Sequence, residues 1–231
     1  MKKPIICAID TPDISKAEEL ALALKNHVAA VKLGLEFFVA NGAAGVKRIA
    51  EIGIPIFLDL KFHDIPNTVA KACSAAAELG VWMVNVHASG GNKMMEAAKD
   101  ALDKCSHRPK LIAVTVLTSM DQQDLQEIGI DLTPAQQVKR LAALAQVSGM
   151  DGVVCSAQES SMLSADLGAD FVLVTPGIRP AGADQGDQKR IMTPIQAMQA
   201  GSHYLVMGRP ITQAADPIAL LRQINQELLQ A

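Results

Sequence analysis

The sequence predicts one α/β domain over residues 1–231, folded as a closed (β/α)₈ barrel of the TIM type. Short β-rich runs alternate with longer segments rich in Ala, Leu, Lys and Glu, and the alternation occurs eight times. Strands that alternate with helices form a parallel sheet. A doubly wound open sheet is the alternative, but eight units in 231 residues favour a closed barrel.

The elements follow one another along the chain in a regular order. Strands are expected at residues 4–10, 29–35, 54–61, 81–88, 110–118, 152–156, 171–177 and 204–208. The helices expected between and after them cover residues 14–27, 37–52, 67–79, 92–104, 134–148, 159–167, 194–200 and 217–229. Capping residues support these helices. Their beginnings carry Asp13, Ser15, Thr133, Thr193 and Asp216, and their ends are followed by Gly53, Gly80, Gly149, Gly168 and Gly201.

Composition argues against several classes of protein. No apolar run approaches the roughly 18 residues that span a bilayer, so a soluble protein without a membrane partner is expected. The first residues lead directly into a strand without a signal-type cleavage site, which predicts a cytoplasmic location. The four cysteines are widely spaced, so reduced thiols in packed positions are expected.

Charge and motif content predict neither a nucleic-acid partner nor a metal or cofactor. The net charge is −3 with interspersed signs, and one Trp and one Tyr offer few surfaces on which bases could stack. Five histidines lack the close pairing that suits zinc. No Walker loop or dinucleotide-binding GxGxxG pattern is present.

A charged segment covers the end of the third expected strand and the turn after it. Asp59 and Lys61 are two residues apart, so a regular strand would point both side chains to one face. Asp64 falls in the following turn, and Lys32 ends the neighbouring strand. Carboxylates around an ammonium favour its charged form, and such a group can donate a proton. A structural ion-pair network is the alternative, but burying several charges for stability alone is unfavourable, which favours a functional site.

The expected fold gathers polar residues at one rim. In a (β/α)₈ barrel, reactive groups lie at the carboxyl ends of the strands. All eight of these ends carry polar residues, namely Asp10, Lys32, Asp59 with Lys61, His87, Thr118 with Ser119, Ser156, Thr175 and Arg209.

Two loops after the seventh and eighth strands predict a phosphate site. Gly177 with Arg179 and Gly208 with Arg209 combine backbone amides with guanidinium groups at the place where such barrels hold phosphate. The alternative is that the glycines are only turn residues and the arginines only solvated. The polar stretch 179–190 has the length of a lid or a loop tip.

The segment Asp59-Leu60-Lys61-Phe62-His63-Asp64-Ile65-Pro66-Asn67-Thr68 resembles the signature of the orotidine 5′-phosphate decarboxylase family. The resemblance extends along the chain through residues 8–10, 31–34, 116–119, 174–180, Gln188 and 208–211. Related sugar-phosphate decarboxylases and synthases share Asp-x-Lys-x-x-Asp. The Pro-Gly-Ile-Arg-Pro loop, Gln188 and Gly-Arg-Pro-Ile favour the nucleotide enzyme.

The resemblance implies decarboxylation of orotidine 5′-monophosphate to uridine 5′-monophosphate in pyrimidine biosynthesis, without metal, flavin or pyridoxal. It implies a homodimer with sites shared across the interface, where Asp64, Ile65 and Thr68 reach the neighbour's pocket. Lys61 would be the proton donor in an array with Lys32, Asp59 and the partner's Asp64. The implied substrate contacts are Asp10 and Lys32 to ribose, Thr118 or Ser119 to the pyrimidine, and Gln188, Arg179, Gly208 and Arg209 to phosphate.

Two other functions fit the same sequence features. A 3-keto-gulonate-6-phosphate or hexulose-phosphate type barrel would need a divalent metal to stabilise an enediolate. A catalytically silent barrel that binds a phosphosugar is the non-enzyme alternative.

Overall fold

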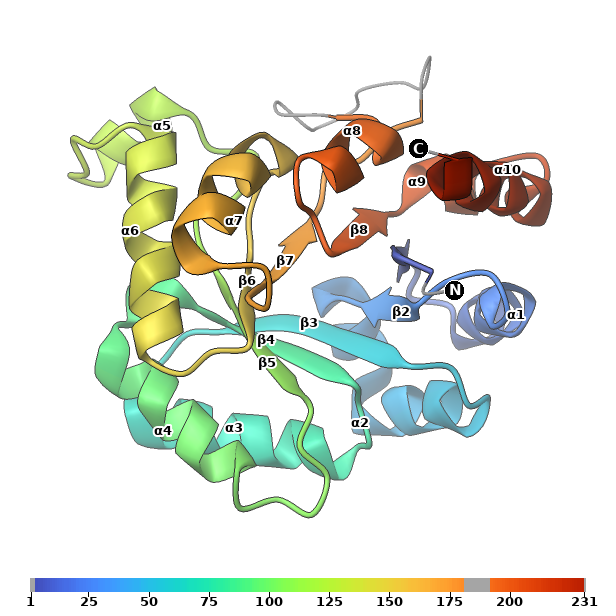
Figure 1. Cartoon of the computed structure of the whole chain (residues 1–231). Coiled ribbons are helices and arrows are strands. Elements are labelled where there is room, and N and C mark those ends of the chain that lie inside the picture. Colours follow the sequence, from blue (N-terminus) through green and yellow to red (C-terminus); the bar gives the residue numbers. More distant parts are fainter. Residues whose placement is uncertain (1–2, 181–191, 231) are drawn as a thin grey trace.

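The computed structural model describes residues 3–180 and 192–230, and these residues form a closed barrel of parallel strands (Figure 1). Strand β1 pairs with β2 through Ile6 and Ala30, and with β8 through Ile5 and Leu205, so no strand edge is left open. The (β/α)₈ prediction is confirmed, and the open-sheet alternative is wrong. The strands are β1 (Ile5–Ile9), β2 (Ala30–Leu33), β3 (Ile56–Phe62), β4 (Met83–His87), β5 (Lys110–Val114), β6 (Gly152–Val154), β7 (Val172–Thr175) and β8 (Tyr204–Met207).

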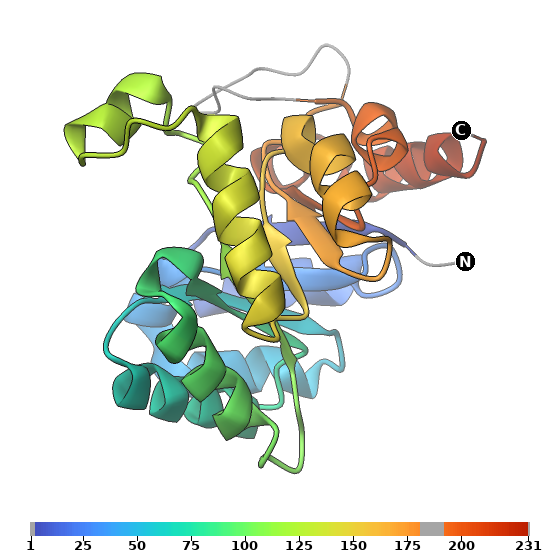
Figure 2. The ribbon, with the colours of Figure 1, turned by 60° about the vertical axis from the view of Figure 1, so that its left-hand side comes forward.

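Helices surround the barrel on its outside, as the two ribbon views show (Figures 1 and 2). The α-helices are α1 (Ile14–Leu24), α2 (Leu35–Glu51), α3 (Pro66–Glu78), α4 (Asn92–Leu102), α5 (Gln122–Glu127), α6 (Pro134–Val147), α7 (Ser160–Leu167), α8 (Pro194–Gln199), α9 (Arg209–Thr212) and α10 (Pro217–Gln230). Short 3₁₀ turns form at Ala88–Gly90 and Ala157–Glu159. Helices α5 and α9 and both turns were not predicted, and α5 projects from the barrel in both views (Figures 1 and 2).

Most of the predicted capping residues do cap helices. The Asp13 carboxylate accepts hydrogen bonds from two backbone amides at the start of α1, and Thr133 and Thr193 form capping boxes. The Asp216 carboxylate accepts two more at α10, whereas Ser15 lies one residue inside α1. All five predicted helix-end glycines have positive φ angles, as expected for left-handed termination.

The buried apolar residues form two layers. The larger cluster lies between the strands and the helices, and includes Phe37, Ile49 and Leu102. The smaller cluster is built from strand residues only, with some partly buried neighbours packed against it. Its members are Ile6, Ala8, Ala30, Phe57, Met83, Ile112, Val174, Tyr204 and Val206. A filled barrel interior of this kind places any ligand site at a rim rather than in a central pore.

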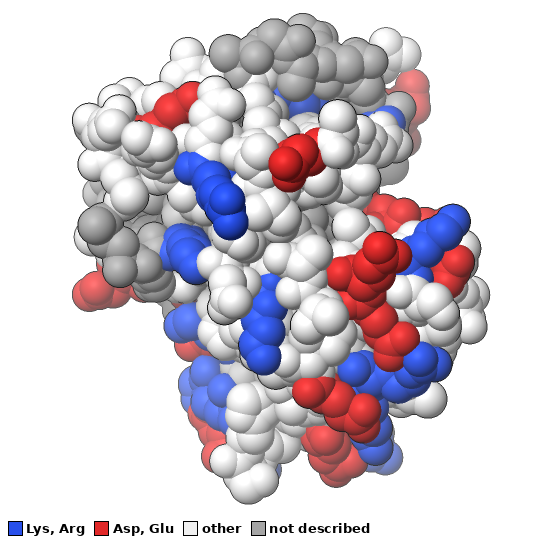
Figure 3. All heavy atoms as spheres, turned by 90° about the vertical axis from the view of Figure 1, so that its right-hand side faces the viewer, with Lys and Arg blue, Asp and Glu red and all other residues white. Residues whose placement is uncertain are grey.

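The surface carries both charge signs. On the face in Figure 3, acidic and basic side chains lie beside one another. All four cysteines are free, and three of them are buried, as predicted. Among the helices of residues 3–180 and 192–230, none is both long and apolar enough to cross a membrane.

Candidate active site

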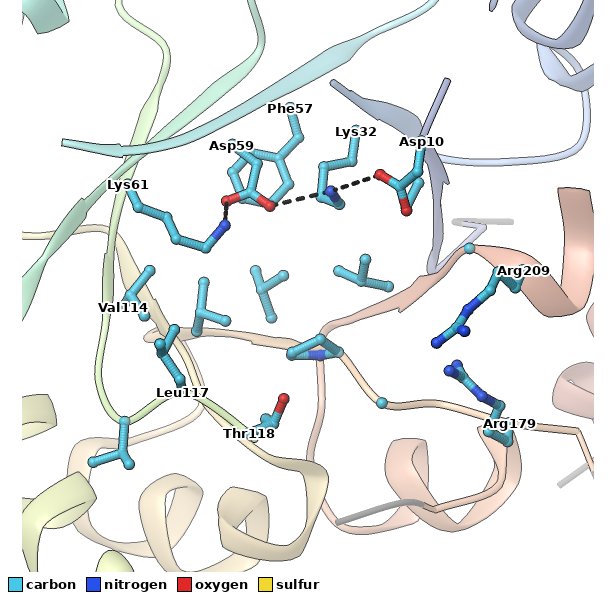
Figure 4. A pocket seen from close by; sticks show the side chains of 18 residues that line it. Asp10, Lys32, Phe57, Asp59, Lys61, Val114, Leu117, Thr118, Arg179 and Arg209 are labelled. Atoms are coloured by element: carbon cyan, nitrogen blue, oxygen red, sulfur yellow. Dashed lines mark hydrogen bonds and ion pairs between the residues drawn. The ribbon is translucent and has the colours of Figure 1, made fainter. Parts of the chain in front are cut away.

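A cavity of about 270 Å³ opens at the rim formed by the carboxyl ends of the strands. Its apolar floor includes Ala8, Phe57, Val174 and Val206, which belong to the barrel-interior cluster. The polar side chains on its walls come from elements far apart in the sequence (Figure 4). They are Asp10, Lys32, Asp59, Lys61, Thr118, Arg179 and Arg209.

One wall carries a row of alternating charges, visible as the dashed contacts in Figure 4. The Lys61 Nζ lies 2.7 Å from Asp59 Oδ1, and the Lys32 Nζ lies 3.2 Å from Asp59 Oδ2. The Lys32 Nζ is also 3.5 Å from Asp10 Oδ1. The row therefore reads anion, cation, anion, cation along β1, β2 and β3, and ends at the Lys61 ammonium.

The contacts within the row keep Asp59 and Lys32 charged. Burial alone would raise the pKa of Asp59, but the charges of Lys32 and Lys61 and the hydrogen bonds to Asp59 lower it below its ordinary value. Burial alone would lower the pKa of Lys32, but Asp59 and Asp10 raise it above its ordinary value. Asp59 is thus a carboxylate and Lys32 an ammonium at neutral pH.

Lys61 reaches Asp59 by a different route from the one predicted. The register between β3 and β4 shifts, so that Leu58 pairs with Val84 but Phe62 pairs with Val86. Between these two pairs, β3 advances by four residues while β4 advances by two, which is a β-bulge in β3. Within this bulge, Lys61 adopts a φ of 52°. The prediction that Asp59 and Lys61 lie on one side is confirmed, since both line the cavity and their side chains are in contact, but a β-bulge and a left-handed residue replace the regular strand that was expected.

Asn85 on β4 is a residue that the sequence reasoning missed. Its side chain is fully buried. Its Nδ2 donates to Asp59 Oδ1 at 2.7 Å, and its Oδ1 accepts from the Lys61 backbone N–H at 2.8 Å. An amide in the middle of the run Met83-Val84-Asn85-Val86 was the available signal, because a buried polar side chain needs hydrogen-bond partners.

The other end of the cavity is basic. In Figure 4 the guanidinium groups of Arg179 and Arg209 point toward each other. Arg179 is only 8% exposed, and its Nη1 donates to the carbonyl of Ile178 at 3.0 Å. Gly177 and Gly208 also line this end, and a Cβ at position 208 would lie 3.3 Å from the Ala8 Cβ. Two arginines with close backbone can bind an anion such as phosphate.

Not every predicted site residue lies in this cavity. Asp64, Ile65 and Thr68 are exposed at the start of α3, and Ile65 is 67% exposed. Ser119 is absent from the lining, whereas Thr118 belongs to it. Gln188 lies outside the described residues.

Three polar residues at strand ends contact other parts of the barrel instead. The His87 ring lies 5.5 Å from the His63 ring. Ser156 caps a 3₁₀ turn, and the Thr175 hydroxyl donates to the Tyr204 carbonyl at 3.2 Å. Within residues 3–180 and 192–230, no group of three or more His, Cys, Asp or Glu side chains is arranged to hold a metal ion.

A closed (β/α)₈ barrel with ionised side chains gathered in a cavity at the carboxyl ends of its strands is the architecture of a barrel enzyme. Residues 3–224 match the sequence model of the Orotidine 5'-phosphate decarboxylase / HUMPS family. The chain belongs to this family, as its resemblance to the decarboxylase signature predicted.

Named relatives support the same assignment. An orotidine 5'-phosphate decarboxylase of Marinomonas sp. (strain MWYL1) is 66% identical, over 98% of this chain and 97% of the relative. One of Aliivibrio fischeri (strain MJ11) is 59% identical, over 97% of this chain and 96% of the relative. The crystal structure of the Lactobacillus acidophilus orotidine 5'-phosphate decarboxylase superimposes with a TM-score of 0.87 at 42% identity, covering 98% of this chain and 99% of that one. The prediction of an enzyme rather than a silent binding barrel is confirmed.

Proposed function

We propose that this chain converts orotidine 5′-monophosphate to uridine 5′-monophosphate, with Lys61 as the proton donor to C6 of the pyrimidine. The observation that carries the proposal is the row of charges that ends at the Lys61 ammonium, in the same cavity as the paired arginines. Relatives at 59% and 66% identity that bear the name orotidine 5'-phosphate decarboxylase support this substrate.

The nucleotide would lie along the cavity with its phosphate between Arg179 and Arg209. This end offers two guanidinium groups, and Gly208 allows close approach of backbone to the anion. The opposite wall would then receive the ribose near Asp10 and Lys32. The pyrimidine would lie between Lys61 and Thr118, which supports Thr118 rather than Ser119 as its contact.

The chemical step breaks the bond between C6 and the substrate carboxylate. Its electron pair remains on C6 while carbon dioxide leaves, and the ring π-system does not readily absorb this charge. The Lys61 ammonium stabilises the developing carbanion and transfers a proton from Nζ to C6. The resulting neutral amine is reprotonated from solvent.

Asp59 has two roles in this mechanism. Its carboxylate holds the Lys61 ammonium at 2.7 Å, and its negative charge disfavours a second carboxylate placed beside it. One well-placed donor contributes about 3–4 kcal/mol to transition-state stabilisation. The remaining stabilisation would come from remote binding of the phosphate, which orders the site around the base.

We further propose that the active unit is a homodimer that shares its sites. Asp64, Ile65 and Thr68 lie outside the cavity of their own chain and are exposed. This surface position supports a contribution to a neighbouring subunit's cavity. The partner's Asp64 would then extend the row of charges beyond Lys61.

The proton-donor role is tested with Lys61→Ala. Uridine 5′-monophosphate formation, followed by the absorbance change of the pyrimidine, should fall by at least about a thousandfold, since both a donor of about 4 kcal/mol and the proton are lost. Lys139→Ala removes a lysine from an exposed ion pair on α6 and should leave turnover unchanged. Turnover retained by a folded Lys61→Ala protein would refute the role.

Shared sites are tested by mixing two inactive variants, Lys61→Ala and Asp64→Ala. Random exchange of subunits should regenerate about a quarter of the native sites, because half of the dimers are mixed and each holds one intact site. If verified exchange recovers no activity, the sites are not shared.

A chelator separates this reaction from the metal-dependent chemistry of 3-keto-gulonate or hexulose-phosphate type barrels. Orotidine 5′-monophosphate consumption should proceed at the same rate with and without the chelator. Loss of activity that added divalent metal restores would contradict the metal-free mechanism.

A further inference from the structure

We infer that Asn85 is a positioning residue for Lys61, and that its amide holds the β-bulge that aims the ammonium at Asp59. The inference rests on the proposed role of Lys61 as proton donor. Asn85 is absent from the cavity lining, so it acts through Lys61 and Asp59 rather than on the substrate.

The amide of Asn85 joins the two residues that must be aligned. Its Nδ2 donates at 2.7 Å to Asp59 Oδ1, the same oxygen that lies 2.7 Å from Lys61 Nζ. Its Oδ1 accepts from the Lys61 backbone N–H at 2.8 Å. The side chain therefore fixes the lysine at its backbone and fixes the carboxylate that the lysine's ammonium contacts.

The backbone conformation of Lys61 explains why the two hydrogen bonds of the Asn85 side chain are needed. Lysine is disfavoured at a φ of 52°, a conformation that glycine and asparagine adopt more readily. The register shift between Leu58 and Phe62 interrupts the backbone ladder to β4 at this point. The Asn85 side chain supplies the acceptor for the Lys61 N–H, so the strained residue keeps its hydrogen bond.

The surroundings of Asn85 limit what else its amide could do. Its neighbour in register on β5 is Ile112, which is buried and apolar. The charged groups near its amide are Asp59 and Lys61 from β3, with Lys32 from β2 beyond Asp59. His87 follows two residues later on β4. The amide therefore serves the charged row rather than a separate polar cluster.

The first test is Asn85→Leu, which replaces the amide with an apolar group of similar size. The kcat should fall between about 10- and 150-fold, the range for losing a hydrogen bond to a charged group. The KM should change less than about threefold, because the phosphate contacts are untouched. Ser160→Ala is the control, since it removes a fully buried, hydrogen-bonded hydroxyl away from the cavity and should leave kcat unchanged.

The second test is Asn85→Asp, which keeps the acceptor for the Lys61 N–H. When protonated, the new carboxyl can also donate to Asp59, as the amide does. When ionised, it places two carboxylates in contact and disrupts the row. Activity relative to the unsubstituted enzyme should therefore rise as the pH falls. An unchanged pH profile, or failure of this near-isosteric variant to fold even at acid pH, would overturn the inference.

A crystal structure of Asn85→Leu separates this inference from the proposed function. If the inference is right, the φ angle of Lys61 will differ from 52° in this variant, or the contact between Lys61 Nζ and Asp59 Oδ1 will be broken. Unchanged geometry with unchanged kcat would overturn it. If the unsubstituted protein failed to decarboxylate orotidine 5′-monophosphate, the proposed function would be wrong. The crystal structure of Asn85→Leu would still show whether Asn85 positions Lys61.

Discussion

The substitution Asp59→Asn tests whether the charged row is held together by its central carboxylate. Asp59 is 7% exposed and contacts two ammonium groups, at 2.7 Å to Lys61 and 3.2 Å to Lys32. Asparagine keeps the shape but removes the charge. Among the described residues, Lys32 would keep Asp10 as its anionic partner, and Lys61 would lose its ion pair with residue 59.

The expected loss of stability follows from these distances. At an effective dielectric constant of about 20, unit charges at 3.2 Å and 2.7 Å attract by about 5 and 6 kcal/mol. Desolvation of the three groups offsets much of this, and removing one partner of a buried pair typically costs about 3–5 kcal/mol. The Lys61 side chain is 31% exposed and can turn toward water. We therefore expect Asp59→Asn to lower the free energy of unfolding by the smaller of these values, about 3 kcal/mol.

Denaturant unfolding at neutral pH measures this loss, and thermal unfolding should show a decrease in Tm of about 6–12 °C for a domain of this size. Asp166→Asn is a matched control, because its carboxylate pairs with Lys139 at the surface and should contribute under about 1 kcal/mol. Adding Lys32→Met to Asp59→Asn should recover part of the loss by removing the unpaired ammonium. If the Asp59→Asn protein were as stable as the unsubstituted protein, the reasoning would be refuted.

Three further expectations concern the same cavity. Arg209→Ala should raise the KM for orotidine 5′-monophosphate about 10- to 150-fold, since a charge-assisted hydrogen bond to phosphate contributes about 1.5–3 kcal/mol; an unchanged KM in a steady-state assay would place the phosphate elsewhere. Gly34→Ala brings a Cβ within 3.2 Å of Lys32 Nζ and should lower kcat more than stability, as kinetics and unfolding compared on one preparation would show. The pKa of Asp59 is lowered from 3.8, so its contribution to stability is present above that pH and lost only as the pH falls through the lower folded value. The stability gap between the unsubstituted protein and Asp59→Asn should therefore be constant from about pH 5 to 9 and narrow below about pH 4, and a gap that varies within the neutral range would contradict this.

The barrel could be predicted because its elements are marked locally. Apolar β-rich runs mark the strands, and side-chain caps such as Thr133 and left-handed glycines such as Gly149 mark the helix ends. Helix α5 was missed because six residues are too short to show an apolar period. Its capping box between Asp121 and Asp124 was the available signal. The four-residue α9 offers no comparable pattern.

The members of the cavity were predicted better than its geometry. Residue type and position at strand ends were sufficient for Asp10, Lys32, Asp59 and the two arginines. The bulge at Lys61 could not be read from the sequence, because it depends on the register between two strands. The contribution of Asp64, Ile65 and Thr68 across a subunit interface stays a prediction, since these residues are exposed and do not line the cavity of their own chain.

The pairing of β1 with β8 has a consequence for how the molecule matures. The row from Asp10 to Lys61 comes from the first 61 residues of the chain, whereas Arg209 follows the last strand. During synthesis on a ribosome, the nascent polypeptide thus acquires its reactive groups early and its second arginine late. The phosphate site that we propose is completed only when the final strand joins the first, so a partly made chain lacks one of its two arginines.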